Sequence, residues 1–134
     1  MDAVFVLRAL LLAHGPVSAI AGDRVTAGDV PQGEVLPAIG IKEISRSEQA
    51  TASLSQSTVL VTARVQVTIH AKSYRVQKEL LQAAKLAAGP HTGVIAGVTV
   101  RSVKRDIVGP DLSNPDAKTF EQSRDFKVVY IESN

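Results

Sequence analysis

The clearest pattern in this chain is a strict alternation of apolar and mostly polar residues from Val59 to His70. Because successive side chains of a strand point to opposite faces, this alternation predicts one long strand with a buried face and a polar face. The strand would span about 40 Å, whereas a compact domain of this size has a radius of gyration of only about 14 Å. We therefore expect part of the strand to serve contacts outside the core of one subunit. Its apolar positions are Val59, Val61, Ala63, Val65, Val67 and Ile69.

Helical patterns occur at the N-terminus and directly after this strand. Ser73 is a suitable N-cap for a helix that runs to a stop at Gly89–Pro90, with one apolar side and one basic side. The N-terminal helix, Ala3 to Ala13 with Asp2 as its N-cap, is apolar nearly all round. Such a helix is expected to be buried on more than one side. Either a neighbouring subunit or a curled sheet would supply the second covering.

The N-terminal segment also has some features of a secretory signal, namely an apolar run followed by small residues at 17–19. The start carries Asp2 and no Lys or Arg, however, and Arg8 falls inside the run. We therefore predict a folded helix here, and the apolar run is too short to cross a bilayer.

The remaining extended segments predict three more strands. Ala38–Ser45 alternates except at Ile44, where the phase break indicates a bulge. Residues 94–108 form a second long run with a slip in phase near position 102, and residues 120–131 form the last strand. The polar segment Arg46–Ser57 is predicted to be a connecting loop that becomes ordered against a partner. The elements together predict one α+β domain over residues 1–134, in the order α-β-β-α-β-β, with helices packed on one face of a mixed or antiparallel four-stranded sheet.

Composition excludes several classes of function but does not identify one. The chain has 134 residues and 45% hydrophobic content, which suits a single folded domain. Its 15 basic and 13 acidic residues give a net charge of only +2, so nucleic acid is disfavoured as a tight ligand. The chain contains no Cys, which excludes disulfides, thiolate catalysis and zinc ribbons.

A search for catalytic chemistry finds no positive signal. His14, His70 and His91 have no His or carboxylate at metal-ligand spacing on the same element, which favours surface histidines, although a two-His site assembled by folding stays open. The glycines at 89, 93 and 97 lack the Lys-Ser/Thr of a phosphate loop and the dinucleotide fingerprint. We therefore expect no enzyme activity, no catalytic residue, no metal and no cofactor.

Several segments, in order along nearly the whole chain, resemble the tail-completion family of long-tailed bacteriophages, which includes the tail-terminator or tail-to-head joining proteins. The strongest is RVQVTIHAKSY at Arg64–Tyr74, where a strand leads into a helix. The others are LRALLLA near the N-terminus, GDRV at 22–25, PQGEVLPAI at 31–39 and RDFKVVY at 124–130.

This resemblance implies a structural virion protein that forms a homo-hexameric ring, caps the tail tube and joins it to the head-completion or connector protein. It further implies a position at the head–tail junction, assembly in the host cytoplasm, DNA passing through the lumen without sequence-specific binding, and no membrane. For the contact with a neighbouring subunit or the lumen we select Arg64, Gln66 and Thr68 on the polar face of the long strand, with Arg46 and Leu54 in the segment that precedes it.

Three other interpretations stay open at this point. Another neck component of the same particle would also form a ring with extended loops. A small hydrolase or ligand-binding domain would need a polar cleft under the helices, and a nucleic-acid-binding module would need its basic residues gathered on one face.

Overall fold

The computed structural model describes residues 2–50 and 57–133, and within these ranges the chain forms three helices and seven strands. The strands make one sheet in the order β1-β2-β3-β7-β5-β4, with β6 paired to β7. The β1–β2 pair is parallel, and the other strand pairs are antiparallel. In chain order the elements are α1 (Asp2–Ala13), α2 (Gly15–Ala21), β1 (Val25–Ala27), β2 (Ala38–Gln49), β3 (Thr58–Ala71), α3 (Tyr74–Ala88), β4 (Gly93–Ile95), β5 (Val98–Val108), β6 (Leu112–Asn114) and β7 (Thr119–Ser133).

The predicted four-stranded sheet in the order α-β-β-α-β-β is wrong, because the sheet has seven strands and α2 adds a helix. Residues 94–108, predicted as one extended run, reverse direction between β4 and β5. Ala96 and Gly97 make this turn with φ angles of 51° and 77°, the left-handed conformation that a two-residue hairpin requires. Strands β1 and β6 have three residues each, which is too short to produce a recognisable period.

Strand β2 is longer than predicted because the polar residues after Ser45 continue it. Residues 46–49 pair with residues 60–63 of β3, so the prediction of a loop beginning at Arg46 is wrong for these positions. The predicted bulge at Ile44 is confirmed by a shift of register between Glu43 and Ser45. Half of the predicted loop, residues 51–56 with Leu54 among them, lies outside the described residues.

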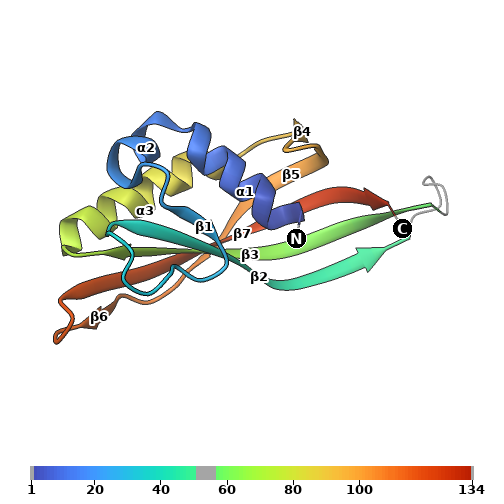
Figure 1. Cartoon of the computed structure of the whole chain (residues 1–134). Helices are drawn as coiled ribbons and strands as arrows, with labels where there is room; N and C mark the ends of the chain where they lie inside the picture. The colour runs from blue at the N-terminus through green and yellow to red at the C-terminus, as the bar shows by residue number, and fades with distance from the viewer. Residues whose placement is uncertain (1, 51–56, 134) are drawn as a thin grey trace.

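Strand β3 has the two faces that its sequence predicts. Burial alternates from Leu60 to the end of the strand at Ala71, and Val61, Ala63, Val65, Val67 and Ile69 are fully buried. The three helices lie together on this buried face of the sheet (Figure 1). The other face, called the open face below, carries the half-exposed side chains of β3, which are Leu60, Thr62, Arg64, Gln66, Thr68 and His70.

The helices are covered largely within the subunit itself. The Ser73 Oγ accepts the Val76 N–H at 3.1 Å, which confirms the predicted N-cap of α3. Helix α1 contacts the sheet, α2 and α3, and its Leu7 and Leu11 are fully buried. The second covering of this apolar helix therefore comes mainly from its own fold, although Phe5 stays 42% exposed.

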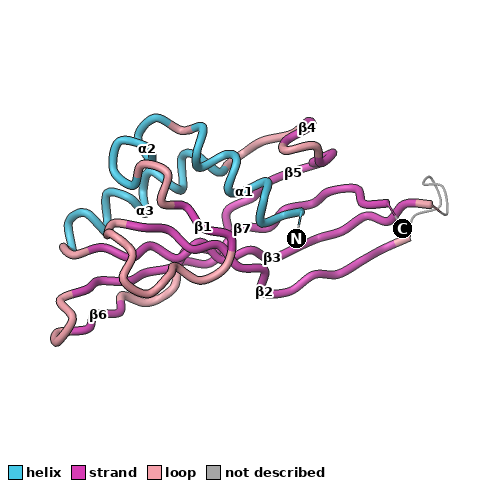
Figure 2. Tube along the Cα trace, viewed as in Figure 1, coloured by secondary structure: helices cyan, strands magenta, loops and turns pink. Residues whose placement is uncertain are grey.

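The sheet is longer than the helical layer. At the end of the sheet where β2 ends and β3 begins, these two strands and the end of β7 continue past the helices (Figure 2). No single helix in the described residues is long and apolar enough to cross a membrane. Helices α1 and α2 reach that length and apolarity only as a pair, with a bend of 88° between them.

Candidate functional site

The open face brings together three of the residues selected from the sequence. Arg64, Gln66 and Thr68 lie at every second position of β3 and therefore share this face. Across the strand boundary they are paired with Lys127, Asp125 and Ser123 of β7. The Gln66 Nε2 donates to the Ser123 Oγ at 3.4 Å. The open face is thus a polar surface built from two adjacent antiparallel strands.

Arg64 is held in place by two carboxylates. Its Nη2 lies 2.6 Å from the Asp125 Oδ2, and its Nε donates to the same oxygen at 2.7 Å. The Asp106 Oδ2, on β5, lies 3.8 Å from the Arg64 Nε. The Asp125 side chain is only 4% exposed, whereas Arg64 is 37% exposed. Arg64 therefore neutralises a buried carboxylate, which gives it a structural role whatever else it contacts.

Arg46 lines one hollow together with Arg64 but forms its ion pairs elsewhere. The pairing of Arg46 with Ala63 places it on the face of the sheet that carries the helices. Its Nη2 forms ion pairs with the Glu132 carboxylate and, at 2.8 Å, with Glu48. The hydrogen bond to Glu132 raises the pKa of Arg46 above its ordinary value, although burial acts in the opposite direction. Leu54, the fifth selected residue, lies outside the described residues.

The open face is hollowed in three places. One hollow of about 340 Å³ lies between β3 and the connection from β1 to β2. A second, of about 260 Å³, shares Gln66, Thr68 and Glu121 with it. A third hollow of about 470 Å³ lies farther along the sheet and is lined by Ser45, Arg46, Ser47, Thr62, Arg64, Asp106, Ile107 and Lys127. Because residues of β2 and β5 line this one hollow, the sheet is curled toward its open face.

Two pairs of charged or polar side chains lie in the first hollow. Lys42 forms an ion pair with Asp29, and the His70 Nε2 lies 3.5 Å from the Glu121 Oε1. Gly40 allows the chain to approach closely here, since a Cβ at this position would lie 2.9 Å from the Gly28 carbonyl oxygen. The described residues contain no group of three His, Cys, Asp or Glu side chains that could hold a metal ion.

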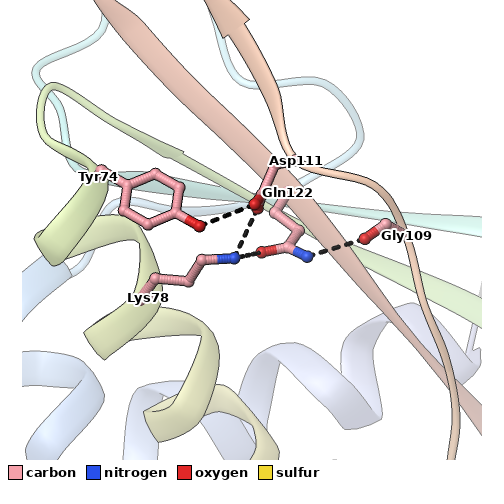
Figure 3. A network of polar contacts seen from close by, with 5 residues as sticks. All are labelled: Tyr74, Lys78, Gly109, Asp111 and Gln122. Carbon is pink, nitrogen blue, oxygen red and sulfur yellow. Dashed lines mark hydrogen bonds and ion pairs between the residues drawn. The ribbon is translucent and has the colours of Figure 1, made fainter.

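A second polar network fixes the chain between β5 and β7 (Figure 3). Tyr74 Oη donates to one carboxylate oxygen of Asp111 at 2.8 Å, and Lys78 Nζ donates to the other at 2.6 Å. Lys78 also donates to the Gln122 Oε1 at 2.6 Å, and the Gln122 Nε2 donates to the Gly109 carbonyl at 2.8 Å. The N-terminal turns of α3 are thereby attached to β7 and to the connection between β5 and β6. We call these five residues the clasp.

The charges of the clasp stabilise one another. The hydrogen bond to Asp111 raises the pKa of Lys78, and the hydrogen bond from Lys78, followed by that from Tyr74, lowers the pKa of Asp111. Sequence reasoning missed this network, because it predicted only that the helix after Ser73 has one basic side. No local signal marks the pair, since its two members are 33 residues apart along the chain.

Comparison with known proteins gives a family and a similar fold. Residues 6–131 match the family model described as tail completion protein gp17. The structure is similar to a chain from the virion of the native gene transfer agent particle, with a TM-score of 0.70 and 12% sequence identity. The similarity covers 98% of this chain and 97% of that one, and at this identity it shows a shared fold. No curated protein matches the sequence.

Proposed function

We propose that this chain, which belongs to the tail completion protein gp17 family, completes a bacteriophage tail by assembling into a ring at the end of the tail tube. The match to the family covers nearly the whole chain, and members of the family are structural proteins of the virion. The chain is therefore a structural component of a phage tail. The ring, its position and its partners are the proposed part.

The observation that carries the proposal is the curled sheet with its uncovered polar face. All three helices cover one face, while the other face is concave and polar along most of β3. A ring of such subunits can place the helices outside and the open faces inside, around a lumen wide enough for DNA. In this arrangement Gln66, Thr68 and Arg64 face the lumen, with Arg64 held by its ion pair with Asp125.

The ring would act by geometry and not by catalysis. Its lower surface would bind the last layer of tail tube protein and prevent further addition, and its upper surface would bind the head-completion or connector protein. No cofactor is required for such a role. The six-fold symmetry is taken from the family resemblance, which also places the ring at the head–tail junction of a particle assembled in the host cytoplasm.

Native mass measurement at several concentrations, alone and with purified tail tubes, tests the proposal. We expect rings of six subunits, or a monomer that forms rings only on tube ends. A second arm uses phage particles that lack the protein, for which we expect tails of uncontrolled length and heads without tails. A monomer that leaves tube length unchanged would refute the proposal. A ring located by electron microscopy on the head side of the joint would instead identify another neck component.

A further inference from the structure

The sheet ends in two long edges that have no strand partner within the described residues. Strand β1 covers β2 only at residues 39–41, with one further bridge between Gly28 and Ile41. Strand β4 covers β5 only at residues 98–100. The β2 edge, defined here as Lys42–Gln49, and the β5 edge, defined as Arg101–Val108, are therefore both open. Each has eight residues, or about 26 Å of strand.

Open edges of this length are templates for pairing with another chain, because a further strand can extend the sheet there. The two edges here differ in charge. The β2 edge carries two basic and two acidic side chains, whereas the β5 edge carries three basic and one acidic. Arg101, Lys104 and Arg105 are exposed, and they form no ion pair with any residue that the structure describes. Contact between two β5 edges is therefore opposed by their like charges, whereas contact of a β5 edge with a β2 edge is not.

The two edges also differ in shape. At the β2 edge the bulge leaves Ile44 46% exposed. Beside the β5 edge lies a hollow of about 230 Å³ that is lined by the turn Gly89–Pro90 and by residues 103–105. An apolar side chain at one edge and a hollow at the other are the kind of complementary pair that a head-to-tail contact uses.

We propose that the β2 edge of one subunit binds the β5 edge of a second copy of the chain, so that the sheets of neighbouring subunits join into one continuous sheet around the ring. This inference rests on the proposed ring and names the surfaces that build it. Strands β2 and β5 run in opposite directions, because each step along β2-β3-β7-β5 is antiparallel. Rotation about an axis along the strands places β5 of one subunit antiparallel to β2 of the next, which is the ordinary pattern of an antiparallel sheet.

The curl of the sheet suits the closing of a ring of subunits. Residues of both edges line the largest hollow of the open face, Ser45 and Ser47 from β2 and Asp106 and Ile107 from β5. Continued curvature in the same sense turns the open faces toward the axis and leaves the helices outside. Because the contact joins two different patches of each subunit, it generates a ring when the rotation closes.

Disulfide trapping tests this contact, and the chain is well suited to it because it contains no natural Cys. Double variants would combine Ser45→Cys or Ser47→Cys on the β2 edge with Ser102→Cys or Lys104→Cys on the β5 edge. The register with β3 and β7 places all four positions on the open face. As a matched control, Ser47→Cys would be combined with Ser113→Cys on β6, which is exposed but lies on neither edge.

After mild oxidation of assembled protein, at least one edge pair should give a ladder of linked subunits up to the full ring. Its yield should exceed that of the control pair by about tenfold, since adjacent strands bring paired Cβ atoms into disulfide range. A mixture of the two matching single variants should stop at linked dimers. Strong dimers from one single variant alone would mean that like edges meet, which would overturn the proposal.

The outcomes also distinguish a failure of the proposed edge contact from a failure of the proposed ring. Rings of normal mass in which none of the four edge pairs links above the control would refute edge pairing and leave the ring intact. A wild-type chain that stays monomeric, alone and with tail tubes, would refute both.

Discussion

Replacing Arg64 with alanine should destabilise the subunit more than replacing Asp125 with alanine, although Arg64 is the more exposed partner of the ion pair. The Asp125 side chain is 4% exposed and the Arg64 side chain 37% exposed. Arg64→Ala leaves a buried carboxylate without its cation. Asp125→Ala leaves a cation that water reaches and that keeps Asp106 within 3.8 Å.

The expected magnitudes follow from this asymmetry. Breaking a fully buried ion pair by removing one partner costs about 3–5 kcal/mol. Because Arg64 is more than a third exposed, we reduce this to about 2 kcal/mol for Arg64→Ala. For Asp125→Ala we expect about 1 kcal/mol or less, as for a partly solvated pair. In a domain of this size 2 kcal/mol corresponds to a fall in Tm of roughly 6–10 °C.

Urea unfolding followed by far-ultraviolet circular dichroism measures these differences, at a dilution where native mass confirms the monomer. Lys127→Ala is the matched control, because Lys127 is the direct cross-strand neighbour of Arg64, is exposed and forms no ion pair within the described residues. Its free energy of unfolding should change by less than about 0.5 kcal/mol. The double variant Arg64→Ala/Asp125→Ala should cost less than the sum of the two single changes. Equal costs for Arg64→Ala and Lys127→Ala, or strict additivity, would show that Arg64 does not neutralise Asp125.

The clasp and the approach of β1 to β2 give three further predictions. Lys78→Ala removes a donor from the buried Gln122 and should lower the free energy of unfolding by about 1 kcal/mol, whereas Lys85→Ala on the same helix should have little effect; equal urea midpoints for the two would contradict this role. The contribution of the clasp should also depend on pH. Because the pKa of Asp111 is lowered by folding, its contribution is present above the unfolded pKa and is lost as the pH falls through the folded one; because that of Lys78 is raised, its contribution is present below the unfolded pKa and is lost as the pH rises through the folded one. The difference in stability between wild type and Lys78→Ala should therefore shrink at both extremes of pH, and a constant difference would count against it. Gly40→Ala would place a Cβ 2.9 Å from a backbone oxygen and should cost about 1–3 kcal/mol in thermal unfolding, while Gly15→Ala, with nothing within 4 Å, should be neutral.

Features set by local sequence were predicted well. The alternation from Val59 to His70 and the cap at Ser73 both appear in the structure as expected. The bulge at Ile44 was also visible as a break in phase. Each depends on the geometry of a few consecutive residues, so a single sequence contains the signal. The family resemblance rested on the same kind of segment, and the match over residues 6–131 confirms it.

Features set by pairing between distant segments were missed. The polar residues 46–49 have no strong strand pattern of their own, and they form a strand because β3 offers them an antiparallel partner. The number of strands was wrong for a related reason, since β1 and β6 exist only as short partners of β2 and β7. Pairing energy from a neighbour outweighs weak local preference in such segments.

By itself the sequence determined the two faces of the long strand, the helix that follows it and the family. Only the tertiary structure decided which charges meet. It joined Arg64 to Asp125 and Lys78 to Asp111, and it placed Arg46 on the opposite face from Arg64. The physical reason is that periodicity fixes the direction in which a side chain points, whereas the partner that it reaches depends on strand order and register, which long-range packing sets.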